Sequence, residues 1–264
     1  KFREGSNVQG FYICTEKFIR TTKGGDLYID LELRDLSGAI YGKIWDNIPE
    51  LSAKFDKGDA VAVSGIVEFY LETLQLKINK INKATRQYYG RYGFDPAKIV
   101  PSSKKDPYKM WKAVLSIIGE IKIKDLKKLI LLIYKENKNK IMIKPSSINS
   151  SYNFRSGFLE ETLLMARIAK KIGPYYKIDK DLVIGAILLI KIGVIKQIKS
   201  GYISENSKEG YLLGQTILGR DILNTAIRKL KHFPRDLKIK LEHIMISHEN
   251  NYQPNTSYRP SFPE

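Results

Sequence analysis

The chain has 264 residues, 43% of them hydrophobic, which is enough for one large domain or two ordinary domains with real cores. Its 45 Lys and Arg exceed its 28 Asp and Glu by 17, so we expect a polyanionic partner, either nucleic acid or an anionic membrane surface. The single cysteine, Cys14, excludes an internal disulfide framework, and the sequence holds no run of 18 apolar residues that would predict a transmembrane helix.

The positive charge is distributed unevenly along the chain. Residues 1–90 carry 13 basic and 12 acidic side chains, whereas residues 91–264 carry 32 basic and 16 acidic ones. The second part is therefore expected to face the polyanion more strongly. The first residues lack both an initial Met and the apolar core of a signal peptide, which predicts a cytoplasmic protein, trimmed at this end, with no membrane partner.

Residues 8–83 show the period of two that is typical of half-buried strands. In the segment DLYIDLELRD the apolar side chains from Leu27 to Leu33 are predicted to point inward, and their neighbours outward. Further alternating segments follow, with a short helical connection at 47–55. Five strands of this length predict an OB-fold barrel, which we assign to residues 1–90.

Outward positions on two neighbouring predicted strands combine aromatic rings with a cation. A surface that binds single-stranded nucleic acid needs both, because bases stack on rings while cations bind phosphates. The alternative is that these side chains cover the barrel or pack on another domain. The predicted nucleic-acid-binding residues are Tyr28, Tyr41, Lys43 and Trp45.

The stretch VQGFYICTEKFIRTTKGGDLYIDLELRDLSGAIYGKIWD resembles the N-terminal OB domain of the YhaM-type 3′–5′ exoribonucleases. The later stretch FDKGDAVAVSGIVEFYLETLQLKINKI continues this resemblance. The resemblance implies an OB-fold that handles RNA, joined to a helical HD domain whose histidines and aspartates hold divalent metal.

From Pro107 onward apolar residues recur three and four positions apart in six segments, which predicts an all-helical domain. One of these segments, 182–195, is predicted as a single buried helix that carries Lys191. Tyr and Pro residues among charges at 84–107 are typical of a linker, which we place at 91–107, and we assign a degenerate HD-like helical domain to 108–264. The domain is expected to be incomplete at its C-terminus, because an Asp-containing helix of the family lies beyond Glu264 or is absent.

The resemblance maps the metal ligands of the family onto five positions of this sequence. The family's GGLLEHT corresponds to SGFLEET, its HDIGK to IKIGV, its LLGH to LLGQ and its SHHG to SHEN. Only the last of these motifs keeps an unchanged ligand at its mapped position. The five positions of the degenerate metal site are Glu161, Ile190, Lys191, Gln215 and His248.

These replacements predict that the helical domain holds no metal and no cofactor, and we assign no catalytic residue. A divalent metal needs several imidazoles and carboxylates that converge on one point, and an ammonium would repel it. Because an imidazole has become Glu161 and a carboxylate has become Lys191, we expect these two side chains to form an ion pair. The alternative is that Lys191 extends to solvent from the rim of its helix.

The sequence thus predicts a non-enzymatic RNA-binding protein, bound to a structured RNA assembly such as the ribosome. One alternative is an active metal-dependent 3′–5′ exoribonuclease with an altered metal set or a neighbouring subunit. Another is a scaffold for protein contacts, and a homo-oligomeric state is left open. The predicted phosphate contacts in the second part are Lys104, Lys105, Lys109 and Lys112.

Overall fold

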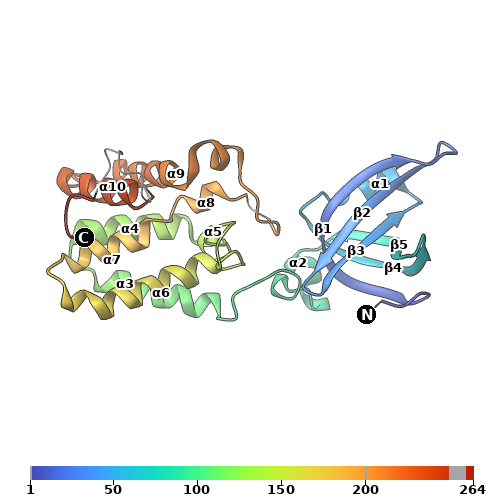
Figure 1. The fold of residues 1–264 in the computed structure, drawn as a ribbon, viewed down its shortest axis with the longest axis horizontal. Coiled ribbons are helices and arrows are strands. Elements are labelled where there is room, and N and C mark those ends of the chain that lie inside the picture. The colour runs from blue at the N-terminus through green and yellow to red at the C-terminus, as the bar shows by residue number, and fades with distance from the viewer. Residues whose placement is uncertain (1, 200, 250–259) are drawn as a thin grey trace. The chain divides into compact units, whose positions relative to one another are not determined.

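The computed structural model describes residues 2–199, 201–249 and 260–264 (Figure 1). The chain divides into two compact units. One extends to Pro101 and also takes in Gly201–Ile203, and the other begins at Ser102. Our finer division into 1–90, a 91–107 linker and 108–264 remains a proposal. Each unit is described by itself below.

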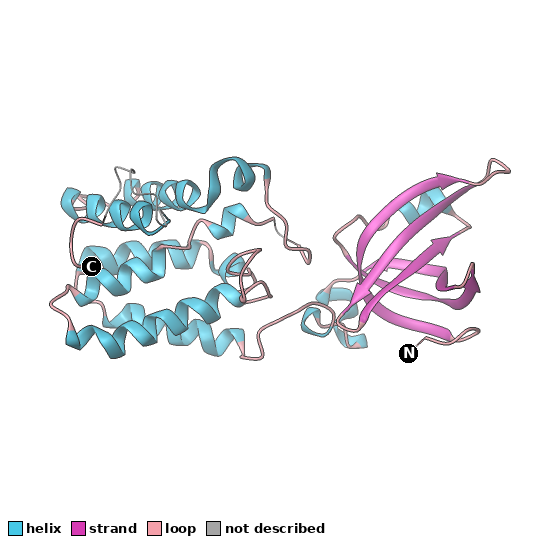
Figure 2. Cartoon of the chain, viewed as in Figure 1, coloured by secondary structure: helices cyan, strands magenta, loops and turns pink. Residues whose placement is uncertain are grey.

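The first unit contains a closed five-stranded barrel with the strand order β1-β2-β3-β5-β4, drawn in magenta in Figure 2. All neighbouring strands pair antiparallel except β3 and β5, which pair in parallel and close the barrel. This topology confirms the predicted OB-fold. The elements are β1 (Asn7–Thr21), β2 (Leu27–Asp35), β3 (Gly38–Ile44), α1 (Ile48–Ser52), β4 (Ala60–Tyr70) and β5 (Thr73–Lys83).

Side chains of β2 alternate between the barrel interior and its outer surface as the sequence predicts, with one exception. Ile29, Leu31 and Leu33 are at most 1% exposed. Leu27 was predicted to point inward and is instead 50% exposed, because it begins β2 and pairs with Thr21 at the exposed end of β1. Alternation therefore predicts burial of a side chain only in the part of a strand that lies over the barrel core, and not at an exposed strand end.

The segment after β5 packs against one end of the barrel and belongs to the first unit. It contains α2 (Arg86–Tyr89) and two short 3₁₀ helices, η1 (Gly90–Tyr92) and η2 (Pro96–Lys98). Phe94, which is 3% exposed, packs in a cluster with the barrel residue Ile13. Part of the stretch that the sequence suggested as a linker is thus held by apolar burial.

The second unit is built from helices within the described residues, which confirms the all-helical prediction. Figure 1 shows α9 with α10, α4 with α7 and α3 with α6 as neighbouring pairs. Contacts of α4 with α9 and of α6 with α7 join these pairs. The helices are α3 (Pro107–Glu120), α4 (Lys124–Glu136), α5 (Lys138–Ile141), α6 (Gly157–Ile172), η3 (Gly173–Tyr175), α7 (Lys180–Leu189), α8 (Val194–Gln197), α9 (Lys208–Arg228) and α10 (Arg235–Glu249).

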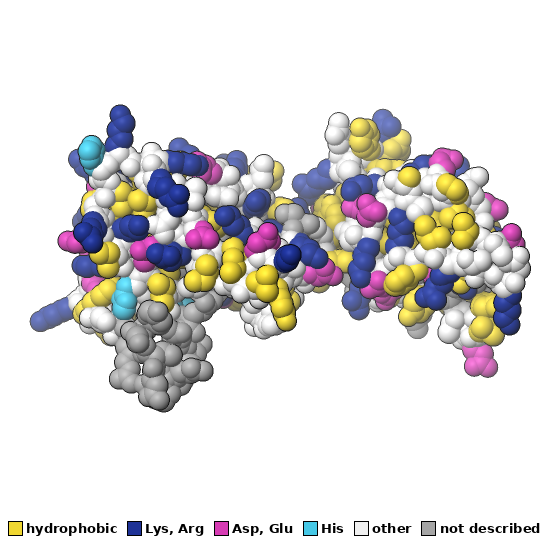
Figure 3. Space-filling model, turned by 90° about the horizontal axis from the view of Figure 1, so that it is seen from above, with side chains coloured by type: hydrophobic (Ala, Val, Ile, Leu, Met, Phe, Trp, Pro, Cys, Tyr) yellow, Lys and Arg dark blue, Asp and Glu magenta, His cyan; other side chains and the backbone are white. Residues whose placement is uncertain are grey.

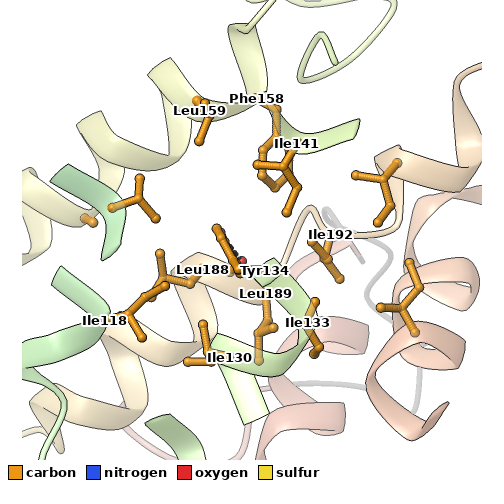
Figure 4. Packing of buried hydrophobic residues seen from close by; sticks show 14 of the residues in the cluster. Ile118, Ile130, Ile133, Tyr134, Ile141, Phe158, Leu159, Leu188, Leu189 and Ile192 are labelled. Carbon is orange, nitrogen blue, oxygen red and sulfur yellow. Dashed lines mark hydrogen bonds between the residues drawn. The ribbon is translucent and has the colours of Figure 1, made fainter. Parts of the chain in front are cut away.

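The core of the helical unit is centred on Tyr134 of α4 (Figure 4). Its ring is fully buried among hydrophobic side chains, and its hydroxyl donates a 2.8 Å hydrogen bond to the backbone oxygen of Leu188. Burial strongly raises the pKa of this phenol, so the hydroxyl stays protonated and remains a donor. The bond ties α4 to α7.

The apolar segment 182–195 does not form the single helix that its periodicity predicts. Helix α7 ends at Leu189, a turn follows, and α8 begins at Val194. At Gly193 the backbone passes so close to α9 that an added Cβ would lie 1.8 Å from the backbone oxygen of Gln215. The break allows this approach and places Lys191 in the turn. No helix among the described residues is long and apolar enough to span a bilayer.

A second buried lysine anchors the chain that leaves α8. Lys144 is 2% exposed, and its ammonium donates hydrogen bonds to the backbone oxygens of Ile198 and Lys199. Burial, and secondarily the nearby charge of Lys140, lowers the pKa of Lys144 to about 8. The lysine therefore replaces water as the donor for two carbonyl groups, at the cost of desolvating its own charge.

Candidate nucleic-acid interface and mapped metal positions

Two of the predicted aromatic residues stack on each other on the outer surface of the barrel. The ring centroids of Tyr28 and Trp45 lie 4.9 Å apart with an angle of 23° between the ring planes. The ammonium of Lys43 lies 5.6 Å from the Tyr28 ring, 5.7 Å from the Trp45 ring and 5.1 Å from the ring of Tyr70. A cation held among three rings beside an exposed indole brings together the two kinds of group that single-strand binding requires.

The register of the strands brings further outward side chains onto this surface. On β1, Phe18 pairs opposite Asp30 and Arg20 opposite Tyr28, so both lie beside the aromatic stack. Phe18 is 49% exposed, and the Arg20 guanidinium lies 5.4 Å from its ring. We call this surface the barrel face, and it comprises Phe18, Arg20, Tyr28, Tyr41, Lys43, Trp45 and Tyr70.

Acidic side chains also lie on the barrel face, and each has a partner. Asp30, opposite Lys43, forms a 3.0 Å ion pair with Arg20. Glu32 accepts a 2.8 Å hydrogen bond from the hydroxyl of Thr15. Because these carboxylates offset part of the positive charge, ring stacking rather than net charge is expected to dominate binding at this face.

Tyr41 lies apart from the aromatic stack. It is 62% exposed and two residues before Lys43 on β3, so it points outward on the same side roughly 7 Å further along the strand. The structure thus brings three of the four predicted residues together and leaves Tyr41 as an extension of the barrel face.

Sequence reasoning missed Tyr70, the third ring around Lys43. Tyr70 ends β4 just before the turn at Leu71 and Glu72, both of which have positive φ, 44° and 61°. In OB-folds the loop between the last two strands borders the ligand-binding surface formed by strands 2 and 3. The outward position of Tyr70 in the alternating pattern of β4 was the available signal.

The four predicted phosphate-binding lysines of the second unit are all exposed. Lys109 and Lys112 lie three residues apart on α3, whereas Lys104 and Lys105 precede this helix. Lys105 is committed to a 2.8 Å ion pair with Glu160. On the face of this unit seen in Figure 3, Lys and Arg side chains are interspersed with hydrophobic and acidic ones rather than gathered in one patch.

Glu160 stays ionised although it is largely covered. Burial opposes ionisation, but hydrogen bonds from the Lys105 ammonium and the Ser103 hydroxyl lower the pKa of Glu160 below its usual value. The ion pair of Lys105 with Glu160 thereby holds the segment that precedes α3 against α6. Lys105 is the least suited of the four lysines to bind a phosphate.

The five mapped metal positions lie on four parts of the helical unit. Glu161 is on α6, Ile190 and Lys191 are in the turn after α7, Gln215 is on α9, and His248 is exposed near the end of α10. The expected ion pair is present. The Lys191 ammonium lies 2.8 Å from Oε1 and 2.7 Å from Oε2 of Glu161.

The ion pair is mostly shielded from water and has a third member. The Lys191 and Glu161 side chains are 19% and 15% exposed, and the Ser146 hydroxyl donates a hydrogen bond to Glu161 Oε2. Gln215 and His248, the other polar side chains at the mapped positions, form no hydrogen bond with the pair among the described residues, and Ser146 is its third member.

The residues at the mapped positions do not fit a divalent metal. The carboxylate of Glu161 is engaged by an ammonium and a hydroxyl, and Ile190 has no ligand atom. Within the described part of the chain, no group of three or more His, Cys, Asp or Glu side chains is arranged to hold a metal ion. An ammonium within 3 Å of the only carboxylate among the five positions opposes the binding of a cation there.

Comparisons with known proteins agree with the OB-fold and identify proteins of known activity that the chain resembles. The family described as OB-fold nucleic acid binding domain matches residues 16–84. The 3′–5′ exoribonuclease YhaM of Halalkalibacterium halodurans is 25% identical over 94% of this chain and 77% of its own length. YhaM of Shouchella clausii is 26% identical over 93% of this chain and 76% of its own.

A solved structure, the second OB-fold domain of replication protein A from Methanococcus maripaludis, is also similar to the chain. It is 21% identical, with 30% of this chain and 85% of that domain covered and a TM-score of 0.26.

These relatives correct one prediction made from the sequence. We expected a protein that is not an enzyme, and the relatives that match most of the chain are 3′–5′ exoribonucleases, which contradicts that expectation. The replaced residues at the five mapped positions describe one site and do not decide the activity of the whole chain. Over both of its units, this chain resembles the YhaM-type 3′–5′ exoribonucleases.

Proposed function

We propose that the protein binds single-stranded RNA, with the barrel face stacking the bases. The observation that carries this proposal is the Tyr28–Trp45 stack with Lys43 held among three rings on the outer surface of an OB-fold barrel. RNA rather than DNA is favoured by the relatives, which are named as exoribonucleases. The match to the OB-fold nucleic acid binding family supports a nucleic-acid partner.

The helical unit would add phosphate contacts to this interaction. Lys104, Lys109 and Lys112 are exposed, and residues 91–264 carry twice as many basic as acidic side chains. A large structured RNA such as the ribosome would suit so basic a surface. Ribosome association, a homo-oligomeric state and a cytoplasmic location are parts of this proposal that rest on charge and composition.

A second candidate function is 3′–5′ exoribonuclease activity. The similarity to YhaM over more than nine-tenths of the chain favours it. Because Lys191 pairs with Glu161, we expect no catalytic metal at the five mapped positions. A metal-dependent reaction would need a different set of ligands or a neighbouring subunit.

One pair of measurements tests both functions. Fluorescence anisotropy with a labelled single-stranded RNA of about 20 nucleotides should show binding that weakens steeply with salt through counterion release. A duplex of the same sequence serves as the control and should bind more weakly, because its bases are not available for stacking. Equal affinity for the duplex would contradict base stacking on the barrel face, and salt-independent binding would contradict the phosphate contacts. Both results together would favour a protein scaffold.

The nuclease test uses the same RNA labelled at its 5′ end, with Mn²⁺ or Mg²⁺ and with a chelator. A ladder that shortens from the 3′ end only when metal is present would establish the second function. RNA that stays intact in all conditions, with binding retained, would leave binding as the function of the chain.

A further inference from the structure

The barrel has a second surface with the chemistry of single-strand binding, away from the barrel face. A groove of about 1190 Å³ runs over β1, β4 and β5 and is bordered by the segment that contains α2 and η1. It shares no residue with the barrel face. We propose that this groove binds a second stretch of the same single-stranded RNA. We call it the β4–β5 groove, and the residues used in the argument are Phe11, Lys80, Lys83, Tyr88, Arg91 and Tyr92.

The floor of the groove follows from the strand register. In β4 the outward residues Ala62 and Ser64 are small, and they lie between outward residues of the two flanking strands. Ala62 pairs with Phe11 of β1, and Ser64 pairs with Lys80 of β5. Small side chains on the middle strand and larger ones on either side produce a trough along β4.

Cations line the groove without acidic neighbours in the lining. Lys54, Lys80, Lys83 and Arg91 contribute to the lining, and no Asp or Glu does. Lys83 is paired with Asp59 at 2.7 Å, outside the lining. Among the described residues, Lys80 and Arg91 form no ion pair, so both remain available to a phosphate.

Exposed rings border the same groove. Tyr88 and Tyr92 are 66% and 63% exposed, so both rings are accessible to a base. The guanidinium of Arg91 lies 4.8 Å from the Tyr92 ring. Rings beside cations provide stacking platforms and phosphate contacts together, as single-strand binding requires.

The bordering segment is held rigidly on the barrel, so its rings are positioned in advance. The ring of Phe11 lies 5.9 Å from that of Tyr89 and 5.1 Å from that of the buried Phe94. Arg86 and Asp95 join the two ends of the segment through a 2.9 Å ion pair. Preorganised rings reduce the entropy lost on binding.

The size of the groove favours a chain of nucleotides over a small molecule. Its volume of about 1190 Å³ exceeds the roughly 300–1,000 Å³ of typical small-molecule sites. A cationic, aromatic and elongated surface matches a flexible polyanion with exposed bases. With the barrel face occupied by one part of a strand, a longer RNA would contact both surfaces of the same barrel.

The test measures binding of the full chain to two single-stranded RNAs, of about 6 and about 20 nucleotides, since a single OB-fold covers roughly 4–16 nucleotides. The Tyr88→Ala/Tyr92→Ala variant should lose tenfold or more in affinity for the long RNA and little for the short one. A matched control, Tyr175→Ala/Tyr211→Ala, removes two tyrosines that are 87% and 80% exposed in the helical unit and should change neither affinity.

A charge variant checks the same groove without removing rings. Lys80→Gln/Arg91→Gln should reduce the slope of log affinity against log salt for the long RNA by about 1.4, since each contact to a single strand contributes about 0.7. Unchanged affinity in the ring variant together with an unchanged slope in the charge variant would overturn the proposal. The Tyr28→Ala/Trp45→Ala variant separates the sites, because its loss for the short RNA reports on the barrel face alone.

Discussion

The ammonium of Lys191 contacts both carboxylate oxygens of Glu161, at 2.8 and 2.7 Å, at the point where the YhaM resemblance places metal ligands. A protein-borne cation thus lies where the related site would concentrate positive charge. Its partner is a carboxylate that the Ser146 hydroxyl also stabilises. This arrangement resolves the desolvation of a lysine within an apolar segment by pairing its charge.

The pair should be strongly coupled in a double-mutant cycle. Lys191→Met and Glu161→Gln should each lower the free energy of unfolding by about 3 kcal/mol, because each leaves a mostly buried group without its partner. The double variant should recover much of this loss. Urea denaturation measures all four proteins.

A surface pair provides the control for this cycle. Lys229 and Glu136 lie 2.8 Å apart, and their side chains are 49% and 41% exposed, so their coupling should stay below about 1 kcal/mol. If the losses in free energy of unfolding at Lys191 and Glu161 are strictly additive, and each is no larger than in this control, burial does not strengthen the pair.

Removal of the aromatic stack should weaken RNA binding. Tyr28→Ala combined with Trp45→Ala should reduce affinity for single-stranded RNA tenfold or more, because stacking contributes roughly 1–3 kcal/mol per base. Tyr108→Ala removes a 62% exposed ring on α3 and serves as the control. Equal affinities in fluorescence anisotropy, with unchanged circular dichroism, would place RNA binding elsewhere on the molecule.

Lys144 should make stability depend on pH in alkaline solution. Its folded-state pKa of about 8 lies below its ordinary value of 10.5, so between these pH values the unfolded chain holds a proton that the folded chain has released. The contribution of Lys144 to the free energy of unfolding therefore increases as the pH rises from 8 to 10.5, and it is lost again as the pH falls through 8. This direction is the one expected for a basic group whose pKa is lower in the folded state than in the unfolded state.

The comparison with Lys144→Met isolates this contribution. The stability difference between the natural protein and the variant should widen by about 2–3 kcal/mol from pH 8 to pH 10.5, since each pKa unit corresponds to about 1.4 kcal/mol. Lys135→Met, at an exposed lysine, should show a constant difference. Urea denaturation at four pH values checks both, and a constant difference for Lys144→Met would rule out the shift.

Two glycines should respond to alanine in opposite directions. Gly193→Ala would place a Cβ 1.8 Å from the backbone oxygen of Gln215 and 2.6 Å from the backbone nitrogen of Gly219, so it should destabilise by more than about 2 kcal/mol. Gly119→Ala on α3 meets no atom within 4 Å and should stabilise by roughly 0.5–1 kcal/mol. Thermal unfolding compares them, and a harmless Gly193→Ala would contradict the close approach to α9.

The barrel and the outward direction of the side chains on the barrel face could be predicted because strand alternation determines which side chains point outward. Tyr28, Lys43 and Trp45 follow from that rule alone. Tyr70 was missed since its role depends on where the β4–β5 turn lies in three dimensions. Within the helical unit, periodicity could not distinguish one buried helix from α7 and α8, because Ile190 and Ile192 continue the apolar pattern through the turn between them.

The ion pair was predictable from two opposite charge changes at positions that the family resemblance brings together. Ser146 was not, because it lies in the segment between α5 and α6, where no periodic pattern constrains direction. The prediction of a non-enzymatic protein was wrong because it extended the chemistry of five positions to the whole chain. Loss of ligands at a mapped site says what that site cannot hold, and the activity of the chain depends on more than that site.

The parallel pairing that closes the barrel is short. It joins residues 41–43 of β3 to residues 75–77 of β5, whereas every other pair of strands is longer. Lys43, at the centre of the aromatic cluster, lies in this pairing. RNA bound across the barrel face would therefore also stabilise the pairing of β3 with β5, which is the shortest in the barrel. Binding should then slow hydrogen exchange of the amides in these two segments more than elsewhere in the barrel, since a ligand stabilises the closed state against local opening.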